Sequence, residues 1–139
     1  MNVSPTIDSK QQAAIEVDAL SPLVMHVRVV NGRGGGPDKT ILNSPRFLRE
    51  FGYRGVCVYL RDPSDAGFSV IEERARLRNA PLEAVNDYGL RDFGIVKRIE
   101  RLVKDYQPRI WHGHDYKSNL IGLLLRRKHP MQMVTTVHG

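Results

Sequence analysis

Two histidines stand two residues apart in the segment Trp111–Asn119, which reads WHGHDYKSN and follows a short apolar run. His112 and His114 would face the same side if the strand persists, because side chains alternate along a strand. A third histidine, His138, lies close to the last residue in the run MQMVTTVHG. Together with Asp115 these histidines could bind a metal ion, since three imidazoles and a carboxylate are chemically adequate ligands.

Metal binding is the less favoured interpretation, because this spacing matches no known ligand signature. Polar loop residues that hydrogen-bond to the backbone would explain the same pattern. His112 alone is better explained as a structural residue, whereas His138, at the tip of a predicted strand, is the stronger candidate for function. We therefore expect no metal site.

Three consecutive glycines, Gly34–Gly36, follow an apolar run in the segment NGRGGGPDKT. A loop without side chains lets a ligand approach the backbone closely, and its N–H groups can point at phosphate or sugar oxygens. The segment is neither the GxGxxG dinucleotide fingerprint nor a P-loop, since no Gly-Lys-Ser/Thr completes it. The alternative interpretation is a flexible turn.

The elements that must position these residues alternate along the chain. Apolar runs predict strands at residues 23–30, 55–62, 81–87, 107–113 and 131–139. Helices are predicted between them, around residues 41–51 and over 68–79, 92–106 and 116–128. In the first helix the apolar stripe is Ile41, Leu42, Leu48 and Phe51, and Pro45 either kinks it or begins a new helix. In the last helix the residues predicted to be buried are Leu120, Ile121, Leu123 and Leu124, with Asp115 as the N-cap.

This alternation predicts an α/β fold, a doubly wound, Rossmann-like parallel sheet of about five strands with helices on both faces. Ligands bind such a sheet beyond the carboxyl ends of the strands, where the winding reverses. The common strand order places the fourth strand between the first and the fifth. The glycine cluster and the histidine segment should therefore flank one crevice, with His138 and Gly139 at the same rim.

Length and composition limit the number of domains, the cellular setting and the kind of partner. The 139 residues suffice for one domain, and no apolar run is long enough to cross a bilayer. The single cysteine, Cys57, excludes an internal disulfide and fits a buried thiol in a reduced setting. Residues 1–22 are predicted to be a polar leader, with disorder as one interpretation. The net charge of +6 is compatible with an anionic partner or with solvated helix faces.

The segments GGGPDKTILN, PRIWHGHDYKSNLIGLLL and MVTTVHG, in this order and each at a predicted strand end, resemble the N-terminal part of a family 4 (group 1) glycosyltransferase with the GT-B fold. The resemblance runs from about Leu23 to Gly139. It implies two Rossmann-like domains facing across a cleft, the N-terminal one mainly binding the acceptor. It also implies hexosyl transfer from a nucleotide-sugar to a glycan or lipid-linked acceptor, as in polysaccharide biosynthesis, usually with retention and without a catalytic metal or cofactor.

The resemblance assigns roles to individual residues. His138 would lie near the transferred sugar and is the predicted catalytic residue. A loop approaching the donor phosphates would consist of Gly34, Gly35, Gly36, Pro37, Asp38 and Lys39. The cleft floor or acceptor side would be lined by His112, His114, Asp115, Lys117, Asn119 and Gly139.

The nucleotide-binding second domain of such enzymes has no counterpart in this sequence. We therefore expect residues 23–139 to be a truncated N-terminal domain that is inactive alone, because half of the cleft that positions donor and acceptor is missing. The single cysteine fits a cytoplasmic protein. Many relatives act on lipid-linked or membrane-bound acceptors, so peripheral attachment to the inner membrane face is a further hypothesis. The cationic face proposed to contact anionic lipid is Lys97, Arg98, Arg101 and Lys104.

Three other functions are alternatives to sugar transfer. A GT-B-like nucleotide-sugar epimerase would share the architecture, since fold does not fix function. A non-enzymatic Rossmann-like binding module could use its positive charge, but no nucleic-acid partner is expected, because the chain has no aromatic-interleaved basic strip and no helix-turn-helix signal. A nicotinamide-dependent dehydrogenase lacks the glycine spacing, although Asp62 lies close to the expected acidic position.

Overall fold

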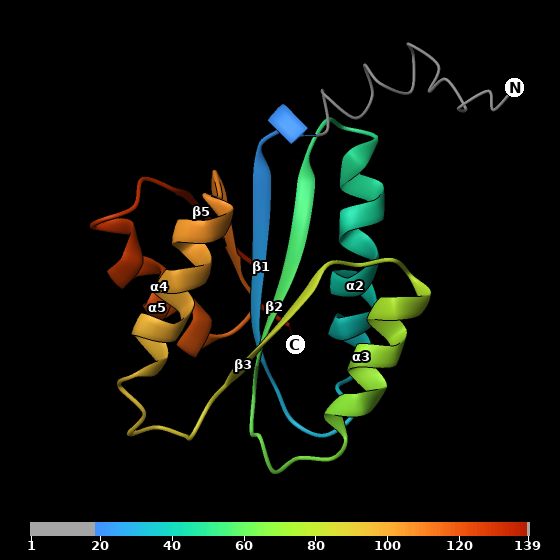
Figure 1. Cartoon of the computed structure of the whole chain (residues 1–139), viewed down its shortest axis with the longest axis vertical. Coiled ribbons are helices and arrows are strands. Elements are labelled where there is room, and N and C mark those ends of the chain that lie inside the picture. The colour runs from blue at the N-terminus through green and yellow to red at the C-terminus, as the bar shows by residue number, and fades with distance from the viewer. Residues whose placement is uncertain (1–18, 139) are drawn as a thin grey trace, which may run out of the picture.

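Within residues 19–138, which are those that the computed structural model describes, five parallel strands form one sheet in the order β3-β2-β1-β4-β5 (Figure 1). The strands are β1 (Leu23–Val30), β2 (Arg54–Arg61), β3 (Leu82–Asn86), β4 (Ile110–Gly113) and β5 (Gln132–Thr135). The winding reverses between β1 and β4, which pair in parallel. The predicted doubly wound sheet is confirmed; Gly139 and most of the predicted leader lie outside the described residues.

Helices cover both faces of the sheet. Helices α2 (Gly36–Arg49) and α3 (Phe68–Leu77) lie on one face, and α4 (Ile95–Tyr106) and α5 (Tyr116–Arg126) lie on the other (Figure 1). Alternation along β1 sends Met25 and Val27 into the core against α4 and α5. The intervening residues of β1, which include His26 and Arg28, therefore face α2.

Helix α2 runs through Pro45 without a break, so the second of the two predicted alternatives, a new helix starting there, is wrong. Proline has no N–H, which leaves the carbonyl of Ile41 without its partner in the helix. The thiol of Cys57 on β2 donates to that carbonyl at 3.4 Å. Burial raises the pKa of Cys57 to about 12, so the thiol keeps the proton that it donates.

The buried face of α5 differs from the prediction. Ser118, Ile121, Gly122 and Leu125 are buried, whereas Leu120, Leu123 and Leu124 are exposed. A side chain at Gly122 would overlap the indole of the fully buried Trp111, so this glycine is where the helix meets β4. The predicted stripe of α2 also fails at Phe51, which lies beyond the helix and is 76% exposed.

Helix α4 begins at Ile95, three residues later than predicted, and buries Ile95, Ile99 and Val103 against the sheet. None of the helices in the described part of the chain is long and apolar enough to cross a membrane.

Candidate functional site

Four histidines lie together on the α2 face of the sheet, and we call them the histidine cluster: His26, His112, His114 and His138. Because β1 pairs with β4, His26 lies directly beside His112, with ring centroids 5.0 Å apart. His114, just beyond the end of β4, stacks on His112 at 4.1 Å. His138 follows β5, and its ring lies nearly parallel to that of His114, with the ring centroids 5.4 Å apart. The predicted grouping of His112, His114 and His138 thus gains a member from β1.

Sequence reasoning missed His26, which is almost fully buried in the middle of β1. The available signal was a histidine and an arginine two residues apart inside the apolar run LVMHVRVV, which puts both on one face. The run alone does not say which neighbouring strand lies beside that face. The pairing of β1 with β4, which places His26 level with His112, identifies the neighbouring strand.

Burial sets the electrostatics of the cluster. It lowers the pKa of His26 to about 3, with the nearby His112 adding to the shift. It also lowers the pKa of His114 to about 3, and His112, His26, His138 and Arg28 contribute in that order. The pKa of His112 is lowered as well, by burial first and by His138 second. These rings are therefore neutral near pH 7, and each offers one N–H donor and one acceptor nitrogen.

The cluster also contains the residues best placed to hold a metal ion. His26, His112 and His114 each offer a ring nitrogen, and these atoms lie within 4.8 Å of one another. However, the planes of His112 and His114 are only 29° apart in a stack. Ring lone pairs point along the ring plane, so two stacked imidazoles do not aim at one shared ion. A tetrahedral site of the kind zinc prefers would require one of these rings to turn.

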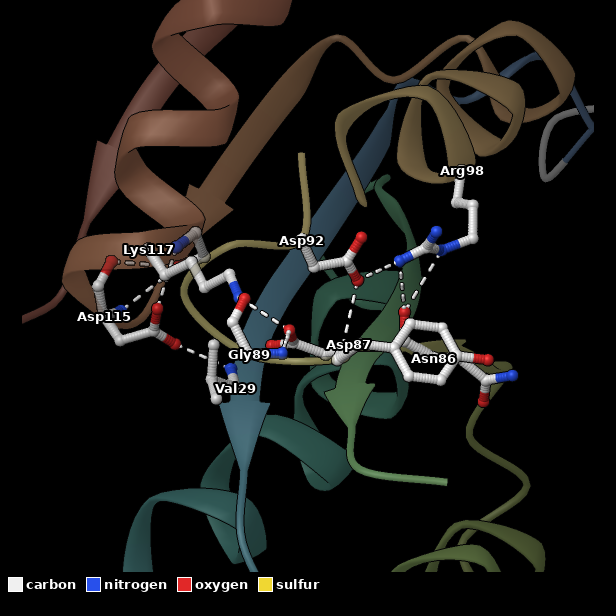
Figure 2. A network of polar contacts seen from close by, with 10 residues as sticks. Val29, Asn86, Asp87, Gly89, Asp92, Arg98, Asp115 and Lys117 are labelled. Carbon is white, nitrogen blue, oxygen red and sulfur yellow. Dashed lines mark hydrogen bonds and ion pairs between the residues drawn. The ribbon is translucent and has the colours of Figure 1, made fainter. Parts of the chain in front are cut away.

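Asp115, which the sequence suggested as a metal ligand or cleft residue, accepts hydrogen bonds from backbone N–H groups of the fold (Figure 2). One carboxylate oxygen accepts from the backbone N–H of Ser118 at 2.8 Å and caps α5. The other accepts from the backbone N–H of Val29 at 2.7 Å. The capping prediction is confirmed, and the carboxylate also ties α5 to β1.

Two other predicted cleft residues do not touch the histidine cluster. The amine of Lys117 donates to Asp87 at 2.6 Å and to the carbonyl of Gly89 at 3.1 Å (Figure 2). It lines a hollow at the ends of β1, β2 and β3 on the α5 side of the sheet. Asn119 accepts from Thr135 at 3.4 Å and fills the space where a side chain at Gly113 would stand. Both side chains join neighbouring segments of the fold.

The glycine loop between β1 and α2 is supported from within by Asp38. This carboxylate is fully buried and accepts from the backbone N–H of Gly35 at 2.6 Å and from the guanidinium of Arg28 at 2.7 Å. Gly34 has a φ of +73°, and a side chain there would overlap Asp38. Asp38, predicted to approach phosphate, thus shapes the loop and lies beneath its surface.

A hollow of about 370 Å³ opens beside this loop, and we call it the glycine hollow. Its lining residues are Gly34, Gly35, Gly36, Lys39, Arg74 and Arg78. The two arginines come from α3 or its C-terminal end and were not predicted. Their spacing of four residues places them on one helix face, but the sequence does not show that this face meets the glycine loop.

The loops after β1 and β2 abut each other beside the glycine hollow. The carboxylate of Asp65 accepts from the backbone N–H groups of Gly32 at 2.6 Å and Gly67 at 2.9 Å. A Cβ at Gly67 would stand 2.6 Å from the carbonyl carbon of Gly32. The two backbones therefore touch with no room for a side chain between them.

Arg28 connects the glycine loop to the histidine cluster. It is paired with Asp38 beneath the loop, and its charge contributes to the low pKa of His114. The two segments therefore lie at the same edge of the sheet, but the glycine hollow is not the single crevice that both were predicted to flank. None of the four histidines lines the glycine hollow itself, which opens toward α3.

Comparisons with known proteins agree with this fold. Residues 35–139 match the family model described as a Glycosyl transferase 4-like domain. Among solved structures, a glycosyltransferase from Rickettsia africae ESF-5 aligns with a TM-score of 0.62 and 12% identity, over 83% of this chain and 29% of that one. MurG from Acinetobacter baumannii aligns with a TM-score of 0.54 and 16% identity, over 84% and 35% of the two chains. No curated protein sequence gives a significant match. The chain spans about a third of the length of these two solved structures.

Proposed function

Because this chain belongs to the glycosyl transferase 4-like family and has the N-terminal, Rossmann-like half of the GT-B fold, we propose that it forms the acceptor-side wall of a sugar-transfer site. The proposed enzyme is a hexosyltransferase that moves a sugar from a nucleotide-sugar to a glycan or lipid-linked acceptor, with retention of configuration. We further propose that it acts in the cytoplasm and needs no cofactor besides the donor.

The observation that carries this proposal is the placing of a cationic hollow and a histidine cluster at one edge of the sheet. In the glycine hollow, Lys39, Arg74 and Arg78 surround the N-terminus of α2, and no carboxylate is among the lining residues. Helix N-termini and guanidinium groups both favour phosphate oxygens. The hollow therefore suits the diphosphate of a nucleotide-sugar.

His138 is the residue proposed to meet the sugar. It is the outermost member of the cluster, half-buried after β5, and its Nε2 is bonded to His114. A positioned imidazole can hydrogen-bond a sugar hydroxyl and hold the reacting carbon in place, which is a large part of catalysis by orientation. Because the chain spans about a third of the solved glycosyltransferases, we expect its own affinity for the donor to be weak.

A titration of the ¹⁵N-labelled 139-residue chain with nucleotide-sugars, nucleoside diphosphates and inorganic phosphate tests this proposal. We expect a nucleotide-sugar to shift the amides of Gly34–Gly36 and the ring of His138. The double variant Arg74→Gln/Arg78→Gln should weaken binding by about 10-fold or more, because it removes charge-assisted hydrogen bonds.

Arg76→Gln is the matched control, since Arg76 lies on the same helix but pairs with Glu73 at 2.6 Å on the exposed surface. It should leave binding unchanged. Equal losses in both variants, or no shift with any nucleotide-sugar, would contradict the proposal. A response to phosphate alone that leaves His138 unmoved would limit the hollow to phosphate binding and remove the support for sugar transfer.

A further inference from the structure

We propose that His26 and His114 form an imidazole relay that fixes the tautomer and orientation of His138, which makes the buried His26 a positioning residue for the sugar-transfer site. The relay deepens the proposed function, because it acts through His138, but its hydrogen bonds are measurable without any sugar.

Both ring nitrogens of His114 are engaged with other histidines. Its Nε2 lies 3.2 Å from Nδ1 of His26, and its Nδ1 lies 3.1 Å from Nε2 of His138. A neutral imidazole has one N–H and one lone pair, so His114 must donate to one neighbour and accept from the other. We call His26, His114 and His138 the row. The two hydrogen bonds therefore point in the same direction along the row, either toward His138 or toward His26.

The buried end of the row decides the direction. Nε2 of His26 is buried and has no hydrogen-bond partner among residues 19–138. If the bonds point toward His26, this nitrogen carries a proton that reaches no acceptor. If they point toward His138, it keeps only an unshared lone pair. Orphaned buried N–H groups are the rarer of the two in proteins, so the bonds run from His26 through His114 to His138.

The surroundings hold the row in place. His112 stacks on His114 at 4.1 Å, and Nε2 of His112 lies 2.7 Å from the hydroxyl of Thr136. The backbone N–H of His114 donates to the carbonyl of Val27 at 3.1 Å. The titratable and charged groups beside the row are His112 on β4, Arg28 on β1 and Cys57 on β2, which is level with His26 in the sheet.

This direction has a chemical consequence for His138. Its Nε2 accepts from His114, so in the neutral ring the proton stands on Nδ1. His138 then offers an N–H donor to an oxygen of the bound sugar.

Long-range ¹H–¹⁵N correlation spectra of the histidine-labelled chain, recorded with EDTA near pH 7.5, measure the tautomers directly. The chain has five histidines, and the fifth, His129, faces Glu100 of α4 at 3.1 Å, on the other face of the sheet. We expect the Nδ1–H tautomer at His26, His114 and His138. The Nε2–H tautomer at His114 or His138 would overturn the relay. A change in the ring signals of the histidine cluster when EDTA is replaced by Zn²⁺ would also overturn it, because the cluster would then be a metal site.

Three variants separate a relay from simple packing. His26→Asn keeps an amide near the position of Nδ1 and should preserve the tautomers of His114 and His138. His26→Leu removes the donor and should give mixed tautomers at both. His129→Asn is the control and should change neither. If His26→Leu leaves the tautomer of His138 unchanged while the amide spectrum stays native-like, the relay is wrong. If His26→Leu does not fold, the tautomers of the wild type and of His26→Asn still test the relay.

Titration with the nucleotide-sugar then connects the relay to function. In His26→Leu the affinity for the nucleotide-sugar should fall by about 10-fold, as expected for the loss of one oriented hydrogen bond, whereas the affinity for a nucleoside diphosphate, read from the amides of Gly34–Gly36, should be unchanged. His26→Asn should restore the affinity for the nucleotide-sugar. A chain with the predicted tautomers that binds no nucleotide-sugar would contradict the proposed function and leave the relay intact, so the two failures are distinguishable.

Discussion

The carboxylate of Asp115 illustrates how one side chain can position a site without belonging to it. It caps α5 and also satisfies the backbone N–H of Val29 at the end of β1. These two bonds hold the start of α5 against the strand that carries His26. The residue is therefore a structural support for the histidine cluster.

Asp115→Ala should lower the free energy of unfolding by about 1–3 kcal/mol, because it removes an N-cap and leaves the Val29 N–H unpaired. Asp115→Asn keeps an oxygen that can accept one of the bonds, so it should lose less. Urea denaturation followed by tryptophan fluorescence measures both, since Trp111 is the single tryptophan. Equal stability of Asp115→Ala and the wild type would contradict the structural role.

Single residues also show how far the sequence leads. Residue type and strand-end position were enough to bring together His112, His114 and His138. His26 and Arg28 were missed because an isolated strand does not reveal its neighbour. Asp38, Asp115 and Lys117 were chosen for chemistry that they could perform, yet each is engaged by a nearby backbone or charged group that only the fold brings into reach.

At the scale of elements, α4 presents a smaller cationic face than the sequence suggests. The guanidinium of Arg98 donates to the carbonyl of Asn86, pairs with Asp92 and lies 5.4 Å from the ring of Tyr88 (Figure 2). Lys104 lies 3.8 Å from Glu100. Lys97 and Arg101 remain exposed and carry the proposed contact with anionic lipid.

Lys97→Glu/Arg101→Glu should reduce co-sedimentation with vesicles of phosphatidylglycerol by about 10-fold or more, since each basic residue near an anionic surface contributes about 1 kcal/mol. Arg46→Glu/Arg76→Glu makes the same change of charge on α2 and α3, across the sheet, and should have little effect. Sedimentation that does not depend on the anionic lipid content would argue against a membrane contact through α4.

The helices also show what periodicity can and cannot decide. Helix α4 has polar and apolar residues on opposite sides, so the apolar pattern identifies its buried face, Ile95, Ile99 and Val103. Helix α5 has leucines on both its buried and its exposed side, so the apolar pattern does not identify the face that meets the sheet. That choice depends on Gly122, whose missing side chain admits Trp111.

At the scale of the whole molecule, burying neutral histidines makes stability depend on pH. The pKa values of His26 and His114 fall from 6.5 to about 3 on folding. Between these values the unfolded chain binds more protons than the folded one. Stability should therefore be highest above pH 6.5 and fall as the pH is lowered toward 3.

The expected slope is up to about 1.4 kcal/mol per pH unit for each such histidine. Urea denaturation at several pH values between 7.5 and 4.5 measures it. Carboxylates with lowered pKa values, such as Asp92 and Glu100, start from 3.8 and 4.5 and lose their contribution mainly below this window. Constant stability from pH 7.5 to 4.5 would contradict the buried neutral histidines.

The architecture as a whole followed from the order of apolar runs, because right-handed crossovers leave few ways to arrange alternating strands and helices. The same reasoning placed the glycine loop and the histidine segment at one edge of the sheet, where the structure has them. It did not predict that the glycine loop would open toward α3, since that depends on how the loops after β1 and β2 pack.

The backbone contact between Gly32 and Gly67, locked by Asp65, means that the turn preceding α2 and the turn preceding α3 are coupled mechanically. If a ligand displaces the first turn, it must carry α3 along, together with Arg74 and Arg78. Arg74 and Arg78 would thus move together with the backbone amides of the glycine loop. The glycine hollow would keep its shape for a diphosphate while its position changes.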